Sequence, residues 1–337
     1  MRALAVAIVL MRATVAHADS SVVVTLNPAG QQEATNLGLT APDLAQRIHD
    51  QIDEIYQTAR IPSLLRSFAD TTAFADRGLG VDYAMNAGEL MVGPIATGAV
   101  SSDASLGSST HVIGGVVVNF AVMAGASLAR WNLPRWTVFA NGFYESGTIH
   151  SLDGHLLTAG GHVQYRLVPP SRPGALRWIG LDATSGLEFA RWEVGTTTPI
   201  VSKFDIQNVN DSTMHTRFKL TSTGTLSVIA DTLTSPIEVT TGVRLVETIS
   251  VYGGAGVDLT VGSSTITAAL DGALANNNGD VPLGTTRIDA SGSEGPSTTA
   301  VHALAGVQVN TSHVQVFVQG LASPSVTGLS LGLRIVF

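Results

Sequence analysis

The carboxy-terminal segment constrains the fold of this 337-residue chain more than any other part. Apolar residues occupy every second position of the last nine: Leu329, Leu331, Leu333, Ile335 and Phe337. The residues between them include Ser330, Gly332 and Arg334. Because successive side chains of an extended strand point to opposite faces, this segment is predicted to form a strand with one apolar and one polar face.

A strand of this kind that ends on Phe337 resembles the closing strand of bacterial outer-membrane β-barrels. In that class the terminal aromatic residue is read by the barrel-assembly machinery. The resemblance implies a barrel in the outer membrane of a Gram-negative bacterium, with membrane lipid and the assembly machinery as partners. It covers residues 78–337 as a pattern, and the terminal motif is its specific part.

The first 18 residues have the pattern of an export signal. Arg2 precedes an apolar run from Ala3 to Met11, and Ala16-His17-Ala18 matches a small-x-small cleavage site. The apolar run is shorter than the roughly 20 residues that a membrane-spanning helix needs. We therefore expect a signal peptide over residues 1–18 and a mature chain that begins at Asp19.

The composition favours a barrel over a helical membrane protein. Mean hydropathy is +0.28 and only 13% of residues are charged, yet every long apolar stretch is interrupted by Gly, Ser, Thr or Asn. Since backbone groups in lipid must pair internally, a chain without apolar helices can cross a membrane only as a closed barrel. The absence of cysteine excludes a lipoprotein anchor and disulfides.

The net charge is acidic. It is −8 for the whole chain, and −10 after residues 1–18, which hold two arginines and no acid, are removed. Nucleic acid as a partner would require a basic surface instead, so we expect none.

Residues 19–77 are predicted to form a helical segment, either periplasmic or a plug of the barrel. Thr40 suits a helix N-cap, and apolar residues then recur at helical spacing from Leu44 to Ala59. Pro62 ends or kinks this helix, and a second one is expected from Ser63 to about Phe74.

From residue 78 onward the apolar period changes to 2, which predicts strands. The clearest alternating segments are 154–168, 178–192, 217–229, 249–261 and 301–309. We expect an all-β fold, a transmembrane antiparallel up-and-down barrel of about 12 strands (roughly 10 to 14), at about 10 residues per spanning strand.

Connections indicate how the barrel is oriented. Counting back from a periplasmic Phe337, residues 246–248 and 310–312 become short periplasmic turns. The segments 195–215 and 263–299 then fall outside the cell as loops, although 195–215 could hold another strand. Aromatic residues near strand ends are expected to form interfacial girdles: Trp131, Trp136, Tyr165, Trp178 and Trp192.

The polar faces of these strands would line the barrel lumen. The predicted lumen-facing residues are His162, Gln164, Arg166, Asp182, Glu188, Lys219, Glu238, Arg244, Asp258, His302 and Arg334. They mix positive and negative charges, whereas an ion-selective pore typically carries a ring of one sign. Opposed charges inside a narrow barrel can pair and fill it, while the many small wall residues leave room for water.

No pattern of catalysis, cofactor or metal binding is found. His150 and His155 flank Asp153, but no supporting motif surrounds them. A lipid or peptide hydrolase using His162 or His302 is the third-ranked hypothesis. The stretch Asn27-Pro28-Ala29-Gly30 is similar to one in the amino-terminal hatch of the long-chain fatty-acid transporter family, which would imply apolar cargo.

Two functions remain open at this point. The first is a passive pore or transport channel for small or apolar solutes, with lumen residues setting selectivity. The alternative is a closed structural or surface-interaction barrel, adhesin-like and without transport activity, whose external ligand is unknown. They differ in whether the lumen is open.

Overall fold

The computed structural model describes residues 17–337 apart from 59, 78, 87–88, 103–114, 150, 210–214 and 277–279. The signal peptide expected over residues 1–18 lies almost wholly outside this range, as do His111 and His150.

Within these described residues, twelve antiparallel strands form one sheet, so the predicted all-β fold of about 12 strands is confirmed. The strands are β1 (His17–Leu26), β2 (Leu90–Ser101), β3 (Val116–Ser127), β4 (Trp136–Ile149), β5 (Leu152–Val168), β6 (Leu176–Gln207), β7 (His215–Leu245), β8 (Ile249–Asn276), β9 (Val281–Glu294), β10 (Thr299–Asn310), β11 (Val314–Ala322) and β12 (Val326–Val336).

All of these strands except β1 and β9 close into a ring of ten. The ring closes where β12 pairs with β2 and where the first half of β8 pairs with β7 on one side and β10 on the other. Phe337 joins the closure, because its N–H donates to the carbonyl of Leu90 at 2.8 Å. The residues of the predicted terminal signal therefore lie on the strand that closes the barrel.

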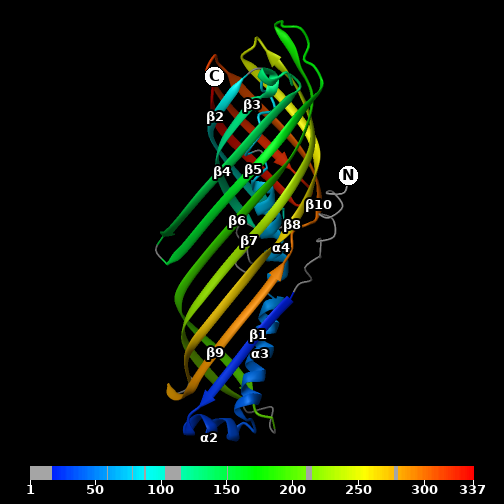
Figure 1. Ribbon diagram of the computed structural model, residues 1–337. Coiled ribbons are helices and arrows are strands. Elements are labelled where there is room, and N and C mark those ends of the chain that lie inside the picture. The colour runs from blue at the N-terminus through cyan, green and yellow to red at the C-terminus, as the bar shows by residue number, and fades with distance from the viewer. Residues whose placement is uncertain are drawn as a thin grey trace.

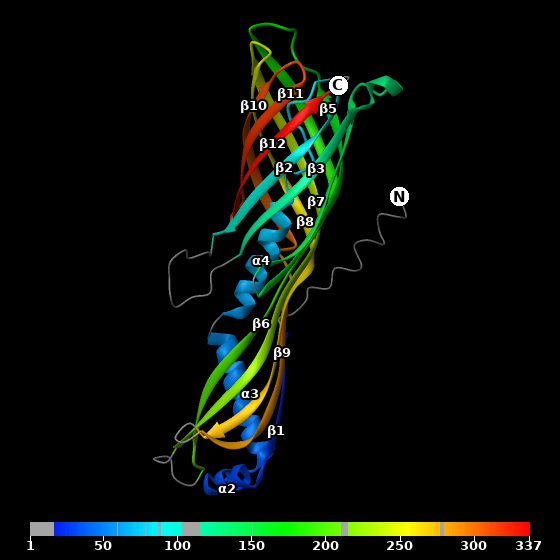
Figure 2. The ribbon, with the colours of Figure 1, turned by 90° about the vertical axis from the view of Figure 1, so that its left-hand side faces the viewer.

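Three strands run far beyond the ring, as Figures 1 and 2 show. Past the ring, the second half of β8 pairs with β9, and β9 pairs with β1. We call the five-stranded sheet made of residues 194–207, 215–230, 263–276, β9 and β1 the extension. It projects from the end of the barrel opposite the carboxy-terminus (Figure 1).

The extension corrects the expected loop at 263–299. Residues 263–276 continue β8, and residues 281–294 form β9, so most of this segment is paired sheet. Its alternation is difficult to recognise because Ala, Gly, Ser and Thr hold many of its positions. Residues 195–207 likewise continue β6.

Three helices precede the ring: α2 (Pro28–Asn36), α3 (Ala41–Thr58) and α4 (Ile61–Ala75). The two helices expected from sequence correspond to α3 and α4, whereas strand β1 at the start of the predicted helical segment was not expected. Figure 2 shows α3 along the extension and α4 at the open end of the ring. No described helix is long and apolar enough to cross a membrane.

An apolar cluster holds α2 and α3 on the extension. Its buried members include Leu44 and Ile48 of α3, Phe204 of β6 and Phe218 and Leu220 of β7. The repeat of apolar residues on α3 at i, i+4 places them on this one face.

The ring is polar inside and apolar outside. On β12 the side chains of Leu329, Leu331 and Leu333 are exposed, whereas Ser330 and Arg334 between them are buried. A water-soluble domain shows the reverse order, so this arrangement suits a barrel surrounded by hydrocarbon.

The aromatic residues are divided between outside and inside. Trp131, Trp136 and Trp178 are exposed near the connections at the carboxy-terminal end, and Trp136 packs on Tyr165 with ring centroids 4.7 Å apart. Trp192 differs from the expected girdle, because it packs against the buried cluster inside the ring.

We predict that Leu331→Lys destabilises the folded barrel in lipid vesicles by about 2–4 kcal/mol, the cost of a lysine facing the bilayer midplane. Val201→Lys on the extension is the control, since Val201 and Leu331 have similar exposed fractions of 57% and 55%. Urea unfolding in vesicles measures both. Equal, small effects would contradict a lipid-facing outer surface.

Candidate functional site

The candidate site is the barrel lumen, which the protein's own chain fills. After α4, residues 76–77 and 79–86 lie inside the ring, and Leu90, the first residue of β2, pairs with Phe337 at the far end. We call the described residues from 76 to 86 the lumen segment. Its described residues from Asp76 to Met85 are all buried, and α4 packs against strands from opposite sides of the ring, including β2, β3, β7 and β8.

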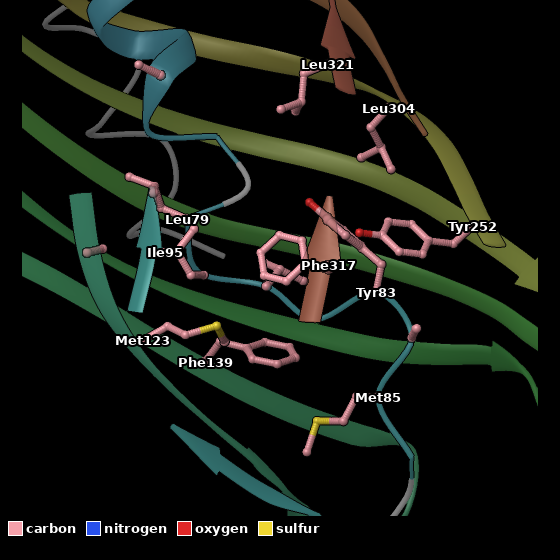
Figure 3. Close-up of a cluster of buried hydrophobic side chains, with 14 of the residues drawn as sticks. Leu79, Tyr83, Met85, Ile95, Met123, Phe139, Tyr252, Leu304, Phe317 and Leu321 are labelled. Carbon is pink, nitrogen blue, oxygen red and sulfur yellow. The ribbon is translucent and has the colours of Figure 1, made fainter. Parts of the chain in front are cut away.

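Apolar side chains of the lumen segment make a core with the wall. Leu79, Tyr83 and Met85 point toward wall residues in Figure 3. The wall residues labelled in Figure 3 come from six strands: Ile95, Met123, Phe139, Tyr252, Leu304, Phe317 and Leu321. Tyr83 and Tyr252 face one another with ring centroids 5.9 Å apart. The lumen is therefore packed like the interior of a soluble domain.

Arg77 is the main positive charge that the lumen segment brings inside. Its guanidinium contacts Asp258 of β8 and lies 3.6 Å from Glu238 of β7. His302 of β10 joins both acids, with Nε2 2.9 Å from Glu238 Oε1 and Nδ1 3.0 Å from Asp258 Oδ1. Tyr83 donates its hydroxyl to Glu238 at 2.7 Å. Two buried carboxylates are thus paired with cationic or titratable groups from the wall and the lumen segment together.

Gly256 lets this cluster form. It pairs with Glu238 on one neighbouring strand and with His302 on the other. A Cβ at this position would lie 2.8 Å from both Glu238 Cγ and His302 Cε1, which is too close for any side chain. The absence of a side chain at Gly256 therefore leaves room for the side chains of Glu238 and His302 to approach each other.

Arg334 of β12 and Asp82 of the lumen segment form a second ion pair, in which the charges are reversed relative to the first. The wall supplies the cation here, and Arg334 Nη1 lies 3.2 Å from Asp82 Oδ1. Arg334 also donates to the carbonyl of Val81 at 2.9 Å and to Gln308 at 3.0 Å, and its guanidinium stacks over Phe317 at 3.9 Å. A planar guanidinium suits this combination of hydrogen bonds and ring stacking.

Further links lie at both ends of the lumen segment. Toward the carboxy-terminal end, Arg244 donates to the side chain of Asn86 and to the carbonyl of Ala84. Toward α4, Asn119 of β3 donates to Asp76 at 2.6 Å and accepts from Trp192 Nε1, also at 2.6 Å. The segment is therefore fixed along its whole length.

Small spaces accompany this packing. The cavity beside Arg77 and Asp258 measures about 20 Å³, and the one beside Asn86 and Arg166 about 10 Å³. Each is comparable to the space one water molecule needs. Neither gives a solute a path through the ring.

The structure places most of the predicted lumen residues inside the ring. Buried there are His162, Gln164, Asp182, Glu188, Glu238, Arg244, Asp258, His302 and Arg334. Arg166 is half-buried and pairs with Asp182 at 3.0 Å. Lys219 instead lies on the extension, outside the ring, where it pairs with Asp280 at 2.9 Å.

Sequence reasoning missed the partners that these wall residues meet. Asp76, Arg77 and Asp82 belong to the lumen segment, which lies between the expected helix and the first strand. The available signal was the presence of three charged residues in a stretch otherwise rich in apolar residues and Gly. Such charges are rarely buried without partners, so they could have been matched to the opposite charges of the wall.

The remaining motifs have structural roles. Asn27 caps α2 by accepting from the N–H of Gly30 at 2.9 Å, at the tip of the extension and far from the lumen. His162 and His302 are buried in the ring, 3.2 Å from Glu188 and 2.9 Å from Glu238. Among the described residues, no group of three or more His, Asp or Glu is placed to hold a metal ion.

Comparison with known proteins gives one family match. Residues 22–337 match the model of a family described as Lsa36-like. No curated protein matches the chain.

Solved structures give distant likenesses. Ail, the attachment invasion locus protein of Yersinia pestis, is 11% identical over 75% of this chain and 100% of that chain, with a TM-score of 0.23. A major outer membrane protein from Thermus thermophilus is 12% identical over 74% and 99%, with a TM-score of 0.30. The translocator domain of autotransporter NalP from Neisseria meningitidis is 10% identical over 74% and 88%, with a TM-score of 0.27. The predicted resemblance to outer-membrane β-barrel proteins is confirmed by the closed antiparallel ring of the described strands. At TM-scores of 0.30 or less the solved structures carry no argument about this chain.

We predict that Arg77→Met lowers the free energy of unfolding by about 3–5 kcal/mol, because it leaves buried carboxylates short of a cation. The matched control is Arg287→Met, whose partner Asp289 is 2.9 Å away on the exposed face of the extension. An exposed pair is screened by water and contributes little to stability, so we expect a much smaller loss in this control. Urea unfolding followed by tryptophan fluorescence measures both, and a similar loss in the two variants would contradict the role given to Arg77.

Proposed function

This chain belongs to the Lsa36-like family, and we propose that it is a closed outer-membrane barrel that anchors a surface-interaction module, not a pore. The observation that carries this proposal is the filled lumen. The lumen segment lies inside the ring and contributes to its apolar core, and its charges pair with the wall at Arg77 and Asp82.

Opening the lumen would be costly. Withdrawing the lumen segment would expose the apolar core, take Arg77 away from Glu238 and Asp258, and take Asp82 away from Arg334. Breaking one buried ion pair by removing a partner costs about 3–5 kcal/mol, and two such links would be broken together. A passive channel would have to supply this energy for every opening, so the geometry favours a permanently closed barrel.

The direction of the chain supports placing the extension outside the cell. The connections at the carboxy-terminal end are short, as at Val246–Thr248 and Thr311–His313, which is typical of periplasmic turns. The extension leaves the opposite end of the ring (Figure 1). An orientation with Phe337 facing the periplasm therefore directs the extension outward.

The length of the extension supports an interaction role. β6 has 32 residues, β7 has 31 and β8 has 28, whereas a membrane-spanning strand needs only about 9–11. The excess forms a sheet with its own apolar core and two covering helices. A barrel whose only role was to span the membrane would not need such a rigid projection.

The first test measures ion conductance across a planar bilayer. We expect the intact mature protein, refolded and inserted in a planar bilayer, to give no discrete ion current, because the lumen segment and its ion pairs block the ring. A variant that lacks residues 19–86 serves as the open-barrel control, with a heat-modifiability gel to confirm that it folds. Stepwise conductance from the intact protein would contradict the proposal.

The second test is topological, and it exploits the absence of cysteine. Ser291 on the extension and Ser312 in a short turn are both exposed serines. We expect Ser291→Cys to react with a membrane-impermeant maleimide on intact cells, and Ser312→Cys to react only after the outer membrane is permeabilised. The reverse pattern would place the extension in the periplasm.

A further inference from the structure

The extension has two sheet edges, and they differ in how they are protected. One edge is residues 197–207 of β6, which pair only with β7 among the described residues; the other is β1, which pairs only with β9. The β6 edge carries Pro199, Lys203 and Asp205. Proline and charged side chains are the usual means by which native proteins prevent another strand from pairing with an edge.

The β1 edge lacks that protection. Residues 20–26, Ser-Ser-Val-Val-Val-Thr-Leu, contain no charge, proline or glycine. Val23 is 56% exposed at the middle of the strand. An edge that is extended, uncharged and rich in β-branched residues is a ready template for one more strand.

A groove runs beside this edge. It has a volume of about 400 Å³, and its lining includes Val22 and Val24 of β1 and Ala41, Pro42 and Ala45 of α3. A strand added to β1 would place every second side chain toward this groove. The groove therefore suits a partner with apolar residues at alternate positions.

Acids outnumber bases around the groove: α3 carries Asp43, Asp50, Asp53 and Glu54 beside Arg47 and His49, and His49, which lines the groove, lies 3.4 Å from Asp53. Asp53 of α3 accepts from Ser20 of β1 at 3.2 Å, and Asp50 accepts from Gln46, which lines the groove, at 2.8 Å. Asp43 lies in the first turn of α3, where the side-chain hydrogen bond from Thr40 lowers the pKa of its carboxyl. Asp43 is consequently ionised at neutral pH.

We propose that the free edge of β1 binds an extended peptide segment of a partner protein, with apolar side chains alternating with basic ones, as an added β-strand. This proposal rests on the surface-interaction function proposed above and names its partner chemistry. Main-chain hydrogen bonds to β1 supply affinity, and the groove takes the apolar side chains. The basic side chains point to the opposite face of the sheet, where Asp19 of β1 shares a face with Asp289 of β9, the pairing partner of Ser21. A second copy of this chain fits less well, because it would bring two acidic α3 helices together.

The probe is a fluorescent ten-residue peptide of alternating valine and lysine, added to the full mature protein in detergent micelles. We expect saturable binding, and about tenfold weaker binding of the alternating valine–glutamate peptide, a difference of about 1.4 kcal/mol. Two N-methylated versions of the valine–lysine peptide test strand pairing. Methylation of one alternate set of amides should abolish binding and methylation of the other should not, since only one set faces β1.

The variants are Val23→Lys on β1 and Val201→Lys on β6. The two valines are equally exposed, at 56% and 57%, and lie on opposite edges of the same sheet. We expect Val23→Lys to weaken peptide binding about tenfold, while Val201→Lys leaves it unchanged. Heat-modifiability gels verify that both are folded.

Each other outcome overturns the proposal. These are absence of binding to the parent protein, equal effects of the two variants, binding of both N-methylated peptides, and concentration-dependent dimers that Val23→Lys abolishes, which would assign the edge to a second copy. Failure here, together with labelling of Ser291→Cys on intact cells, would leave the surface function standing. Peptide binding without that labelling would refute the surface location and keep the edge site.

Discussion

The structure depends on charge neutralisation inside a narrow ring. Lipid outside requires apolar side chains on one face of each strand, and the alternation of the strand then leaves polar and charged residues on the other. Glu238, Asp258 and Arg334 consequently point into a space too narrow to hydrate them well. The protein solves this with its own chain, which supplies Arg77 to the two acids and Asp82 to the arginine. Closure of the lumen is thus a consequence of how the wall is built.

Strand β8 links the ring and the extension. Its first half pairs with β10 and its second half with β9, while β7 follows it throughout. The ring and the extension therefore share three continuous strands with no hinge between them. α4 adds a second connection, because Arg66 pairs with Glu294 at 3.1 Å and Asp70 accepts from Ser297 at 2.6 and 3.0 Å, near the end of β9.

Sequence periodicity predicts the parts of this fold in which burial alternates clearly. The terminal strand ending at Phe337 and helices α3 and α4 carry strong apolar patterns, and both kinds of element form as expected. The sequence pattern does not predict β9 or the second half of β8. Small and hydroxylated residues occupy both faces of these strands, so the apolar residues show no period of 2. The wall positions inside the ring follow from the same alternation, whereas their partners Arg77 and Asp82 come from an irregular segment whose path depends on tertiary packing.

A module that binds partners outside a cell must transmit pulling forces to its anchor. Here a force on β1 or α3 reaches the membrane by two routes, through the paired strands β6, β7 and β8 and through α4 into the lumen segment. The second route ends on the buried ion pairs that Arg77 and Asp82 of this segment make with the wall. Withdrawal of the segment must break both links and expose apolar core at once. The contacts that close the lumen therefore also hold the extension in place.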